Sequence, residues 1–308
     1  MPEVILHHYP QSPVSEKVRV VLGIKGLDWR SVEIPRLPPK PDLMPLTGGY
    51  RLTPVMQVGA DVYCDSACII REIERRFPEP TLFPGGAEGL AWGVSRWTDG
   101  PLFRAAIALV FADSADAMPA AFRADRGPLY FGKDYDVGAL KAALPETLAG
   151  LRAEIGWMAA RLADGRDFML GARAGLPDAL CYYLVWFLRG RYSQGAAFLA
   201  AFDRLVAWEA RVRAIGHGNP SPMNAAEALA IAREATVATP ETPDPDDPQG
   251  LAPGDRVEIA PLDVGGAPAV SGRVLSVTAQ EIAIGRVDAR VGAVAVHFPR
   301  VGYRVRRA

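Results

Sequence analysis

Two serines near the amino terminus stand where their hydroxyls could stabilise an anion. Ser12 closes a loop after a short apolar segment and precedes Pro13, a residue suited to the first position of a helix. Ser15 lies one turn further on. The N–H groups of a helix's first turn have no partner within the helix, so they favour negative charge. The pattern permits a hydroxyl donor beside a bound anion, while an ordinary N-cap serine is the simpler explanation of this motif taken alone.

A second segment with chemical potential is Thr53–Pro54 at the start of an apolar strand. Proline has no N–H to give to a sheet, so its place in a strand needs a reason. A cis Thr53–Pro54 bond would turn the N–H and C=O of Thr53 towards a cleft. The alternative is a proline in an edge strand.

The third segment, Asp65–Ser66, opens a predicted helix. A serine hydroxyl and helix N–H groups can bind a carboxylate while the aspartate binds an ammonium group, so the pair suits a zwitterionic amino-acid group. Asp-Ser is also a common capping dipeptide. Cys64 and Cys68 flank the pair without an adjacent histidine, so we expect small core thiols and no metal site.

The elements that must position these residues alternate between strand and helix. The expected order is strand, helix, strand, long Pro-rich loop, hairpin and helix, at Val4–His7, Ser15–Gly26, Trp29–Ile34, 35–49, 53–64 and Asp65–Phe77. Residues 1–84 therefore form an α/β domain, and residues 85–238 show helical periodicity throughout, which predicts an all-α domain.

The last part of the chain changes character twice. Residues 239–252 are polar, acidic and rich in proline, which predicts a semi-extended linker. Residues 253–308 switch to period two, with Val257 and Ile259 or Ile282 and Ile284 alternating with other residues. This pattern predicts a small five-stranded β module in the form of a half-open barrel.

Composition excludes several classes of protein. With 34 Lys+Arg against 35 Asp+Glu the net charge is −1, which argues against a globally basic nucleic-acid binder. A hydrophobic fraction of 49% is enough for packed cores. The longest apolar run, Ala179–Leu188, is about half of what a membrane span needs. With no targeting signal at the start and only 3 cysteines, we expect a reduced cytoplasmic protein.

Together the three segments resemble the glutathione transferase superfamily. Residues Thr53–Ile70 look like its stretch from the cis-proline to the acidic residue and serine that open its third helix, and Ser12–Arg19 is similar to its serine and omega-like classes. Asp178, which follows the Phe168–Gly171 turn, matches its second domain. The resemblance covers residues 3–215 and implies a thioredoxin-like domain followed by an all-α domain.

The resemblance implies glutathione as co-substrate. Ser12, or Ser15 as the alternative, would donate to the glutathione thiolate. Thr53 and Pro54 would bind through the backbone, and Asp65 and Ser66 would hold the γ-glutamyl group. Lys40 would meet the glycine carboxylate, unless it is simply a solvated lysine. The absence of a cysteine at position 12 makes thiol-transfer chemistry unexpected, and Gly175 replaces the usual capping Ser or Thr before Asp178.

The second substrate would be a small electrophilic molecule with an apolar body. We expect its pocket between the two domains, lined by Tyr9, Trp97, Phe103 and Arg104, although ordinary core packing accounts for those aromatic residues as well. The resemblance also implies a homodimer.

A rival hypothesis is a non-catalytic scaffold with the glutathione transferase fold, whose module at 253–308 binds a protein partner. That module holds eight arginines against five acidic residues. This excess permits weak contact with an anion, but a solvated barrel face explains it too, and nucleic acid is not expected. The enzyme hypothesis ranks first because all three glutathione-binding segments are present.

Overall fold

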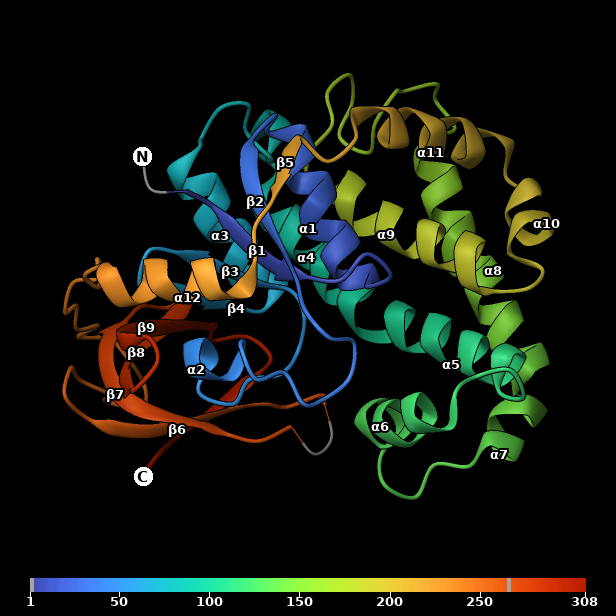
Figure 1. Ribbon diagram of the computed structural model, residues 1–308. Coiled ribbons are helices and arrows are strands. Elements are labelled where there is room, and N and C mark those ends of the chain that lie inside the picture. The colour runs from blue at the N-terminus through green and yellow to red at the C-terminus, as the bar shows by residue number, and fades with distance from the viewer. Residues whose placement is uncertain (1–2, 265–266) are drawn as a thin grey trace. The chain divides into compact units, whose positions relative to one another are not determined.

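The computed structural model describes residues 3–264 and 267–308, and the chain forms two compact units (Figure 1). The first, called here the sheet unit, comprises the described residues of 1–15, 28–73 and 219–308. The second, the helical unit, comprises residues 16–27 and 74–218. The first strands and the last strands of the chain thus belong to the same unit.

The ten strands found in the described residues form one sheet, in the order β10-β6-β7-β8-β9-β4-β3-β1-β2-β5. The strands are β1 (Ile5–His8), β2 (Asp28–Glu33), β3 (Val55–Val58), β4 (Asp61–Cys64), β5 (Asn219–Pro222), β6 (Arg256–Pro261), β7 (Val270–Val277), β8 (Glu281–Asp288), β9 (Gly292–Pro299) and β10 (Tyr303–Arg307). β1 is parallel to β2 and antiparallel to β3, which pairs with β4. The thioredoxin-like fold predicted for the amino-terminal part is confirmed.

Two helices connect these amino-terminal strands. α1 (Pro13–Ile24) begins directly after the β1 loop, with Pro13 at its first position, where a missing N–H costs nothing. α3 (Ser66–Arg76) follows β4 and buries Ile69, Ile70 and Ile73 on one face, as the helical period predicts. The Pro-rich loop between β2 and β3 contains one short helix that the sequence did not indicate, α2 (Met44–Thr47).

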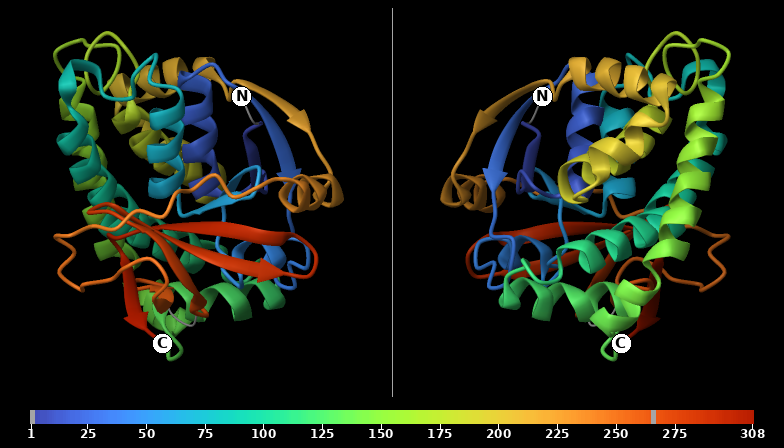
Figure 2. Two further views of the ribbon diagram at one scale, coloured as in Figure 1. Left: turned by 90° about the vertical axis from the view of Figure 1, so that its left-hand side faces the viewer. Right: turned by 90° about the vertical axis from the view of Figure 1, so that its right-hand side faces the viewer.

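The five carboxyl-terminal strands are found as predicted, and they continue the thioredoxin-like sheet. β9 lies parallel to β4, with Tyr63 opposite His297. The other four strands follow from β9 by antiparallel pairing. Figure 2 shows them in orange and red as one group. The β module is therefore an extension of the amino-terminal sheet, joined to it through one strand pair.

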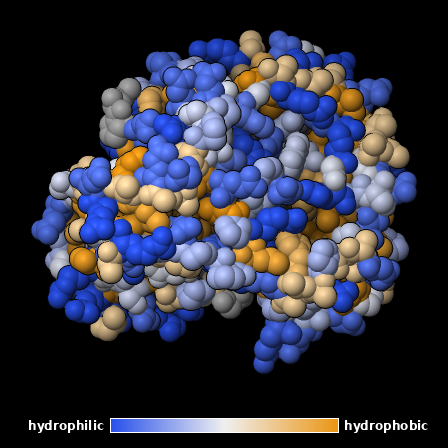
Figure 3. Space-filling model, in the orientation of Figure 1, coloured by the Kyte–Doolittle hydropathy of each residue, from blue (hydrophilic) through white to orange (hydrophobic). Residues whose placement is uncertain are grey.

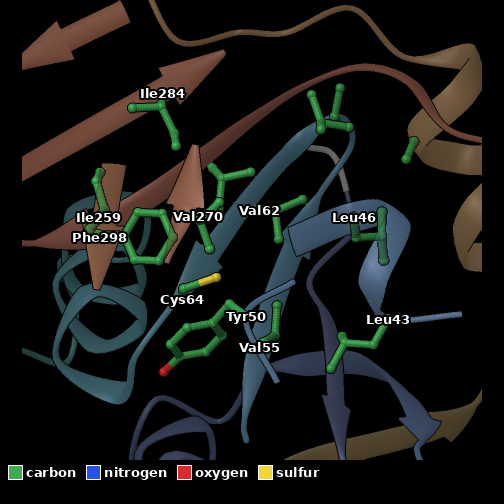
Figure 4. Close-up of a cluster of buried hydrophobic side chains, with 14 of the residues drawn as sticks. Leu43, Leu46, Tyr50, Val55, Val62, Cys64, Ile259, Val270, Ile284 and Phe298 are labelled. Carbon is green, nitrogen blue, oxygen red and sulfur yellow. The ribbon is translucent and has the colours of Figure 1, made fainter. Parts of the chain in front are cut away.

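Both halves of the sheet share one hydrophobic core (Figure 4). It contains Leu43, Leu46, Val55, Val62 and Cys64 from the amino-terminal part and Ile259, Val270, Ile284 and Phe298 from the extension. The rings of Tyr50 and Phe298 meet edge to face at 5.9 Å. Each buried aliphatic side chain of this size contributes about 1.5–3 kcal/mol, so the extension stabilises the fold to which it is attached.

The segment predicted as the end of the all-α domain belongs instead to the sheet unit. α12 (Ala225–Glu234) packs against β2 and β9, as its place in Figure 1 also shows. The Gln57 side chain donates to the carbonyl of Ala228 at 2.8 Å. Asn224 caps the helix, because its side chain accepts from the N–H of Glu227.

The segment 239–252, predicted as a linker, is hydrogen-bonded along β7. The Thr242 N–H donates to the carbonyl of Leu275 at 3.0 Å, and the Val277 N–H donates to the carbonyl of Thr242 at 2.8 Å. Arg300 forms an ion pair with Asp247 at 2.7 Å. The prolines and acidic residues of this segment thus belong to a fixed strap on the sheet unit.

The helical unit contains several long helices and short connecting ones. They are α4 (Glu88–Trp97), α5 (Phe103–Ser114), α6 (Ala120–Phe131), α7 (Val137–Ala142), α8 (Leu144–Arg161), α9 (Leu176–Arg191), α10 (Gly195–Ala200) and α11 (Asp203–Ile215). A π-helical turn, Thr98–Leu102, joins α4 to α5. None of the helices in the described residues is both long and apolar enough to cross a membrane.

The start of α9 shows why glycine stands at position 175. The buried Asp178 carboxylate accepts from the N–H of Gly175 at 2.9 Å, from the N–H of Met169 at 2.8 Å and from the indole of Trp208 at 2.8 Å. A Cβ at Gly175 would lie 2.8 Å from the carbonyl oxygen of Leu82. The missing capping hydroxyl thus reflects a close backbone approach, and burial raises the pKa of Asp178 to about 6 despite these donors.

The surface mixes hydrophilic and hydrophobic residues (Figure 3). On the face seen in Figure 3, hydrophobic residues lie scattered among hydrophilic ones. Six large hydrophobic side chains of the described residues are exposed: Leu90, Trp157, Val206, Leu262, Val287 and Val301. Single exposed residues of this kind are normal on globular proteins.

A buried ionic cluster, called here the His297 cluster, fixes β9 to its neighbours. His297 lies between two carboxylates, with Nδ1 2.8 Å from Oε1 of Glu281 on β8 and Nε2 3.2 Å from Oδ1 of Asp61 on β4. Thr239 donates its hydroxyl to Asp61. The ring of Tyr63 stacks on His297 with centroids 4.2 Å apart. The cluster thus joins β4, β8, β9 and the strap at one point.

The charges of the cluster stabilise one another. Burial lowers the pKa of His297, but hydrogen bonds and charges from Asp61 and Glu281 outweigh it, and the net pKa is raised. For Asp61 the directions are reversed. Burial raises its pKa, but hydrogen bonds from His297, Thr239 and the N–H of Ala238 outweigh burial, and the net pKa is lowered. Near neutral pH the cluster therefore favours an imidazolium between carboxylates.

Replacing His297 by glutamine tests this cluster. The variant leaves the buried Asp61 carboxylate and the partly exposed Glu281 carboxylate without their cation, so we expect its free energy of unfolding to fall by about 3 kcal/mol. Because the folded-state pKa of His297 is raised, its contribution is complete below about pH 6.5 and is lost as the pH rises through the folded-state value. The contribution of Asp61 is lost only in acid, as the pH falls through its lowered pKa.

The measurement is urea denaturation of wild type and His297→Gln at about pH 6 and about pH 9. The difference between the two proteins should be larger at the lower pH. An equal difference at both pH values contradicts a charged His297 in the folded protein.

Candidate functional site

The three segments singled out in the sequence meet at one end of the sheet. The end of β1 lies beside the start of β3, with His7 opposite Val55. The start of β3 lies beside the end of β4, with Val55 opposite Cys64. Pro54 directly precedes β3, Asp65 directly follows β4, and Ser12 closes the short loop after β1; all three belong to the sheet unit. The pairing of the strands therefore gathers them from across 54 residues of sequence.

Ser12 caps α1. Its N–H donates to the carbonyl of Tyr9 at 3.1 Å, which closes the loop after β1. Its Oγ accepts from the N–H of Ser15 at 3.1 Å. The N-cap interpretation of this serine is confirmed. Since accepting a hydrogen bond does not use the hydroxyl hydrogen, Ser12 remains able to donate to an anion at the positive end of the helix.

Ser15 is fully buried, and its hydroxyl finds no hydrogen-bond partner among the described residues. An unsatisfied buried hydroxyl costs about 1–3 kcal/mol. A polar group of this kind, one turn from Ser12, marks a place where a ligand or water would gain a hydrogen bond. The structure therefore leaves both serines as candidate donors.

The Thr53–Pro54 bond is cis, as the sequence predicts, and Pro54 directly precedes β3. Lys40 is not the solvated lysine that the sequence analysis considered. It is 3% exposed, and its Nζ donates to the hydroxyl of Thr53 at 3.0 Å and to the carbonyl of Arg51 at 2.9 Å. The same Nζ lies 5.8 Å from the ring centroid of Tyr9. The lysine thus places a buried cation beside the cis-proline.

Asp65 has a left-handed backbone, with φ at +76°. Its Oδ1 accepts from the N–H of Ala67 at 2.8 Å, which caps α3, and Ser66 is the buried first residue of that helix. Left-handed conformations are uncommon outside glycine and cluster at functional sites. Capping and ligand binding are compatible, because each carboxylate oxygen has two lone pairs.

A residue that sequence reasoning missed completes this end of the sheet. Tyr303, the first residue of β10, donates its hydroxyl to Oδ2 of Asp65 at 3.1 Å. The hydroxyl oxygens of Tyr303 and Tyr50 are 3.2 Å apart. Period-two alternation placed Tyr303 on a strand, but no signal in the sequence links a strand at position 303 to a helix start at 65.

The cysteines are buried thiols, in agreement with the sequence analysis. Burial raises the pKa values of Cys64 and Cys68 well above the usual thiol range, which suppresses the reactive thiolate. Cys68 also lies with its Sγ 3.2 Å from Oε2 of Glu281, so a thiolate there would face a carboxylate.

The residues proposed for the acceptor pocket fall into different units. Tyr9 is buried in the sheet unit, while Trp97, Phe103 and Arg104 lie in the helical unit. The Trp97 ring is 5.7 Å from that of Trp157. Phe103 packs on Tyr130, Tyr183 and Phe187 with centroids 5.8–6.5 Å apart, and Arg104 is exposed. Within the helical unit this is an aromatic cluster, and the pocket stays a prediction.

A buried lysine pairs with the π-helical turn beside that aromatic cluster. Lys17 donates to Oδ1 of Asp99 at 2.6 Å, and the hydroxyl of Tyr183 donates to the same oxygen at 2.9 Å. Ser95 donates to the second oxygen at 2.8 Å. Asp99 lies outside the motifs predicted from the sequence. The hydrogen bonds from Lys17, Ser95 and Tyr183 to Asp99 hold α1 to the segment between α4 and α5.

Comparison with known proteins shows the family to which the chain belongs. A model of the glutathione S-transferase N-terminal domain matches residues 6–81. A GST-like protein from Pseudomonas syringae, known from its crystal structure, is 37% identical with a TM-score of 0.79. That match covers 99% of this chain and 100% of the other, including the carboxyl-terminal extension. The chain belongs to the glutathione transferase superfamily.

Other proteins match over shorter stretches. A maleylpyruvate isomerase from Ralstonia sp is 28% identical over 86 residues, and a zeta-class glutathione S-transferase from Euphorbia esula is 32% identical over 87. Each match covers 27% of this chain, which spans 41% and 38% of the two relatives. FzlA from C. crescentus, 21% identical with a TM-score of 0.52, covers 68% of this chain and 88% of that one and shows the shared fold.

The buried Ser15 hydroxyl gives a direct test of the site's description. In Ser15→Ala an unsatisfied polar group is replaced by a methyl group, so we expect the ligand-free protein to be unchanged or stabilised by up to about 1 kcal/mol. Thermal denaturation without ligand measures this. Ser12→Ala is the contrasting variant, because it removes the N-cap and should cost about 1 kcal/mol. A loss of stability in Ser15→Ala equal to that in Ser12→Ala contradicts an unpartnered hydroxyl.

Proposed function

We propose that this member of the superfamily binds glutathione and stabilises its thiolate for attack on the electrophilic carbon of a small apolar substrate. The observation that carries this proposal is the common location of the Ser12 hydroxyl, the cis Thr53–Pro54 bond and the Asp65–Ser66 pair at one end of the sheet. Each has an ordinary structural explanation alone. Their convergence supports a site for one extended thiol peptide.

Each residue has a chemical task in this site. Asp65 binds the γ-glutamyl ammonium, and Ser66 with the N–H groups of α3 binds the adjacent carboxylate. The Thr53 backbone binds the cysteinyl part. Lys40 lies beside Thr53 and supplies positive charge for the glycine carboxylate, in keeping with its buried Nζ.

Ser12 acts on the thiol. A free thiol has a pKa of about 8.5, so only a few per cent is thiolate at neutral pH. A hydroxyl donor at a helix N-terminus stabilises the anion, and a fall of about two pKa units corresponds to about 2.7 kcal/mol. One charge-assisted hydrogen bond together with the helix end supplies that amount. Ser15, with its unpartnered hydroxyl, is the second candidate donor.

Glutathione binding is tested first, with Asp65→Ala as the diagnostic variant. At about 100 times its Kd a ligand stabilises the folded state by about 2.7 kcal/mol, so the melting temperature of the wild type should rise with glutathione concentration. Asp65→Ala removes the partner of the ammonium group and should lose the shift. Asp134→Ala, at an exposed aspartate of the helical unit, is a matched acidic control and should keep it. No shift in the wild type at any concentration contradicts the proposal.

Thiolate activation is tested separately with Ser12→Ala. The variant should bind glutathione with little change, while the thiol pKa of the complex, followed by ultraviolet absorbance, rises by about two units. The conjugation rate at neutral pH then falls by up to about a hundredfold. The electrophile panel includes maleylpyruvate, because one relative is named for its isomerisation. If Ser15→Ala rather than Ser12→Ala causes these changes, Ser15 is the donor; binding without turnover on any electrophile favours the scaffold.

A further inference from the structure

The Asp65 carboxylate accepts from one donor in its own helix start and from one in a distant part of the chain. Oδ1 accepts from the N–H of Ala67, two residues along in the same helix start. Oδ2 accepts from the hydroxyl of Tyr303, 238 residues later in sequence. The first donor fixes one oxygen, and the second fixes the rotation of the carboxylate plane about the remaining torsion.

Tyr303 itself is held firmly. It is 8% exposed, and its ring packs against Phe298 with centroids 5.7 Å apart. Its backbone is the first of β10, paired with Pro261 of β6. Burial, with the nearby charge of Asp65, raises the pKa of Tyr303 well above its usual range, so the hydroxyl keeps its hydrogen at every physiological pH.

The direction of the hydrogen bond follows from the chemistry of the partners. An ionised carboxylate can only accept, so in the contact with Asp65 the Tyr303 hydroxyl is the donor, and the Tyr50 hydroxyl oxygen is a second acceptor within reach of the same hydrogen. Each carboxylate oxygen has two lone pairs, so accepting from Ala67 and Tyr303 is compatible with binding an ammonium group as well. The Tyr303 hydroxyl adds an orientation that the helix start alone would not fix.

We propose that Tyr303 is a positioning residue of the glutathione site, through which the carboxyl-terminal extension orients Asp65 towards the γ-glutamyl ammonium group. This inference rests on the proposed function. It assigns a role in the site to the extension, which would otherwise serve only the fold or a partner. The hydroxyl acts through Asp65 and makes no contact with the reacting sulfur.

The test compares glutathione with cysteinylglycine, which lacks the γ-glutamyl group. Tyr303→Phe removes only the hydroxyl and keeps the buried ring. By calorimetric titration, we expect the Kd for glutathione to rise about three- to tenfold, which is the usual worth of one such hydrogen bond. The Kd for cysteinylglycine should not change. In conjugation assays, KM for glutathione rises while kcat is preserved, because thiolate activation belongs to Ser12.

A double-mutant cycle identifies the route of the effect. Measured on the free energy of unfolding without ligand, the effects of Tyr303→Phe and Asp65→Ala should be less than additive, because each variant removes the same hydrogen bond. The matched control is Tyr63→Phe. Tyr63 is a buried residue of β4 in the same sheet. Its hydroxyl donates to the carboxylate of Glu72 on α3, the helix that follows Asp65, at 2.9 Å. This control should lose stability without a change in the Kd for glutathione.

The outcomes separate the inference from the proposed function. If the wild type binds glutathione and Asp65→Ala abolishes binding, but Tyr303→Phe binds as tightly as the wild type or more tightly, the inference alone is wrong. If Tyr303→Phe weakens the binding of glutathione and of cysteinylglycine equally, or if Tyr63→Phe also weakens glutathione binding, Tyr303 has a merely structural role. Either result also overturns the inference. A wild type that does not bind glutathione, or whose binding survives Asp65→Ala, overturns the proposed function and the inference together.

Discussion

The pairing of β9 with β4 is the contact on which the architecture of the sheet unit depends. Without it the last strands would be a separate body, because their other pairings are all among themselves. The pair is short, with registered partners only from Asp61 to Tyr63, so its hydrogen bonds alone give modest stability. The His297 cluster reinforces it with buried charge, and the shared core covers the sheet face beside it. Charge specifies the register at this junction, and apolar burial supplies most of the energy.

The proposed site depends on this junction, although none of its residues lies in it. β9 leads directly through a short turn into β10, so fixing β9 beside β4 brings Tyr303 to the helix start that follows β4. The carboxylate of Asp65 is held there on a left-handed backbone, which is a conformation that persists only where its surroundings determine it. A carboxylate that accepts from Ala67 and Tyr303, on a backbone held in this way, is restrained before any ligand arrives. Rigidity of this kind reduces the entropy lost on binding, so it favours affinity for a charged amino group.

The parts of the fold that follow local rules were predictable from the sequence, and the parts that depend on long-range pairing were not. Proline and serine spacing marked the start of α1 and the cis bond at Pro54, because each reflects the chemistry of one or two residues. Period two predicted the number of carboxyl-terminal strands, yet it says nothing of which strand they join. One signal was available in the sequence of β9, which is apolar at nearly every position from Ala293 to Phe298. Such a run is typical of a strand that is buried on both faces, and Ala295 and His297 are indeed buried. The hydrogen bond from Tyr303 to Asp65 could not be predicted, because it depends on how all ten strands of the sheet are arranged.

The extension also changes where the sheet ends. In the strand order the outermost positions belong to β5 and β10, and β4 is an interior strand. Two of the four residues of β5 are prolines, which have no N–H to offer to an incoming strand. β10 presents the exposed side chains of Arg304, Arg306 and Arg307, whose like charges repel a second copy of the same edge. A ten-stranded sheet would otherwise be an open template for aggregation, and here the amino acids at its two margins terminate it.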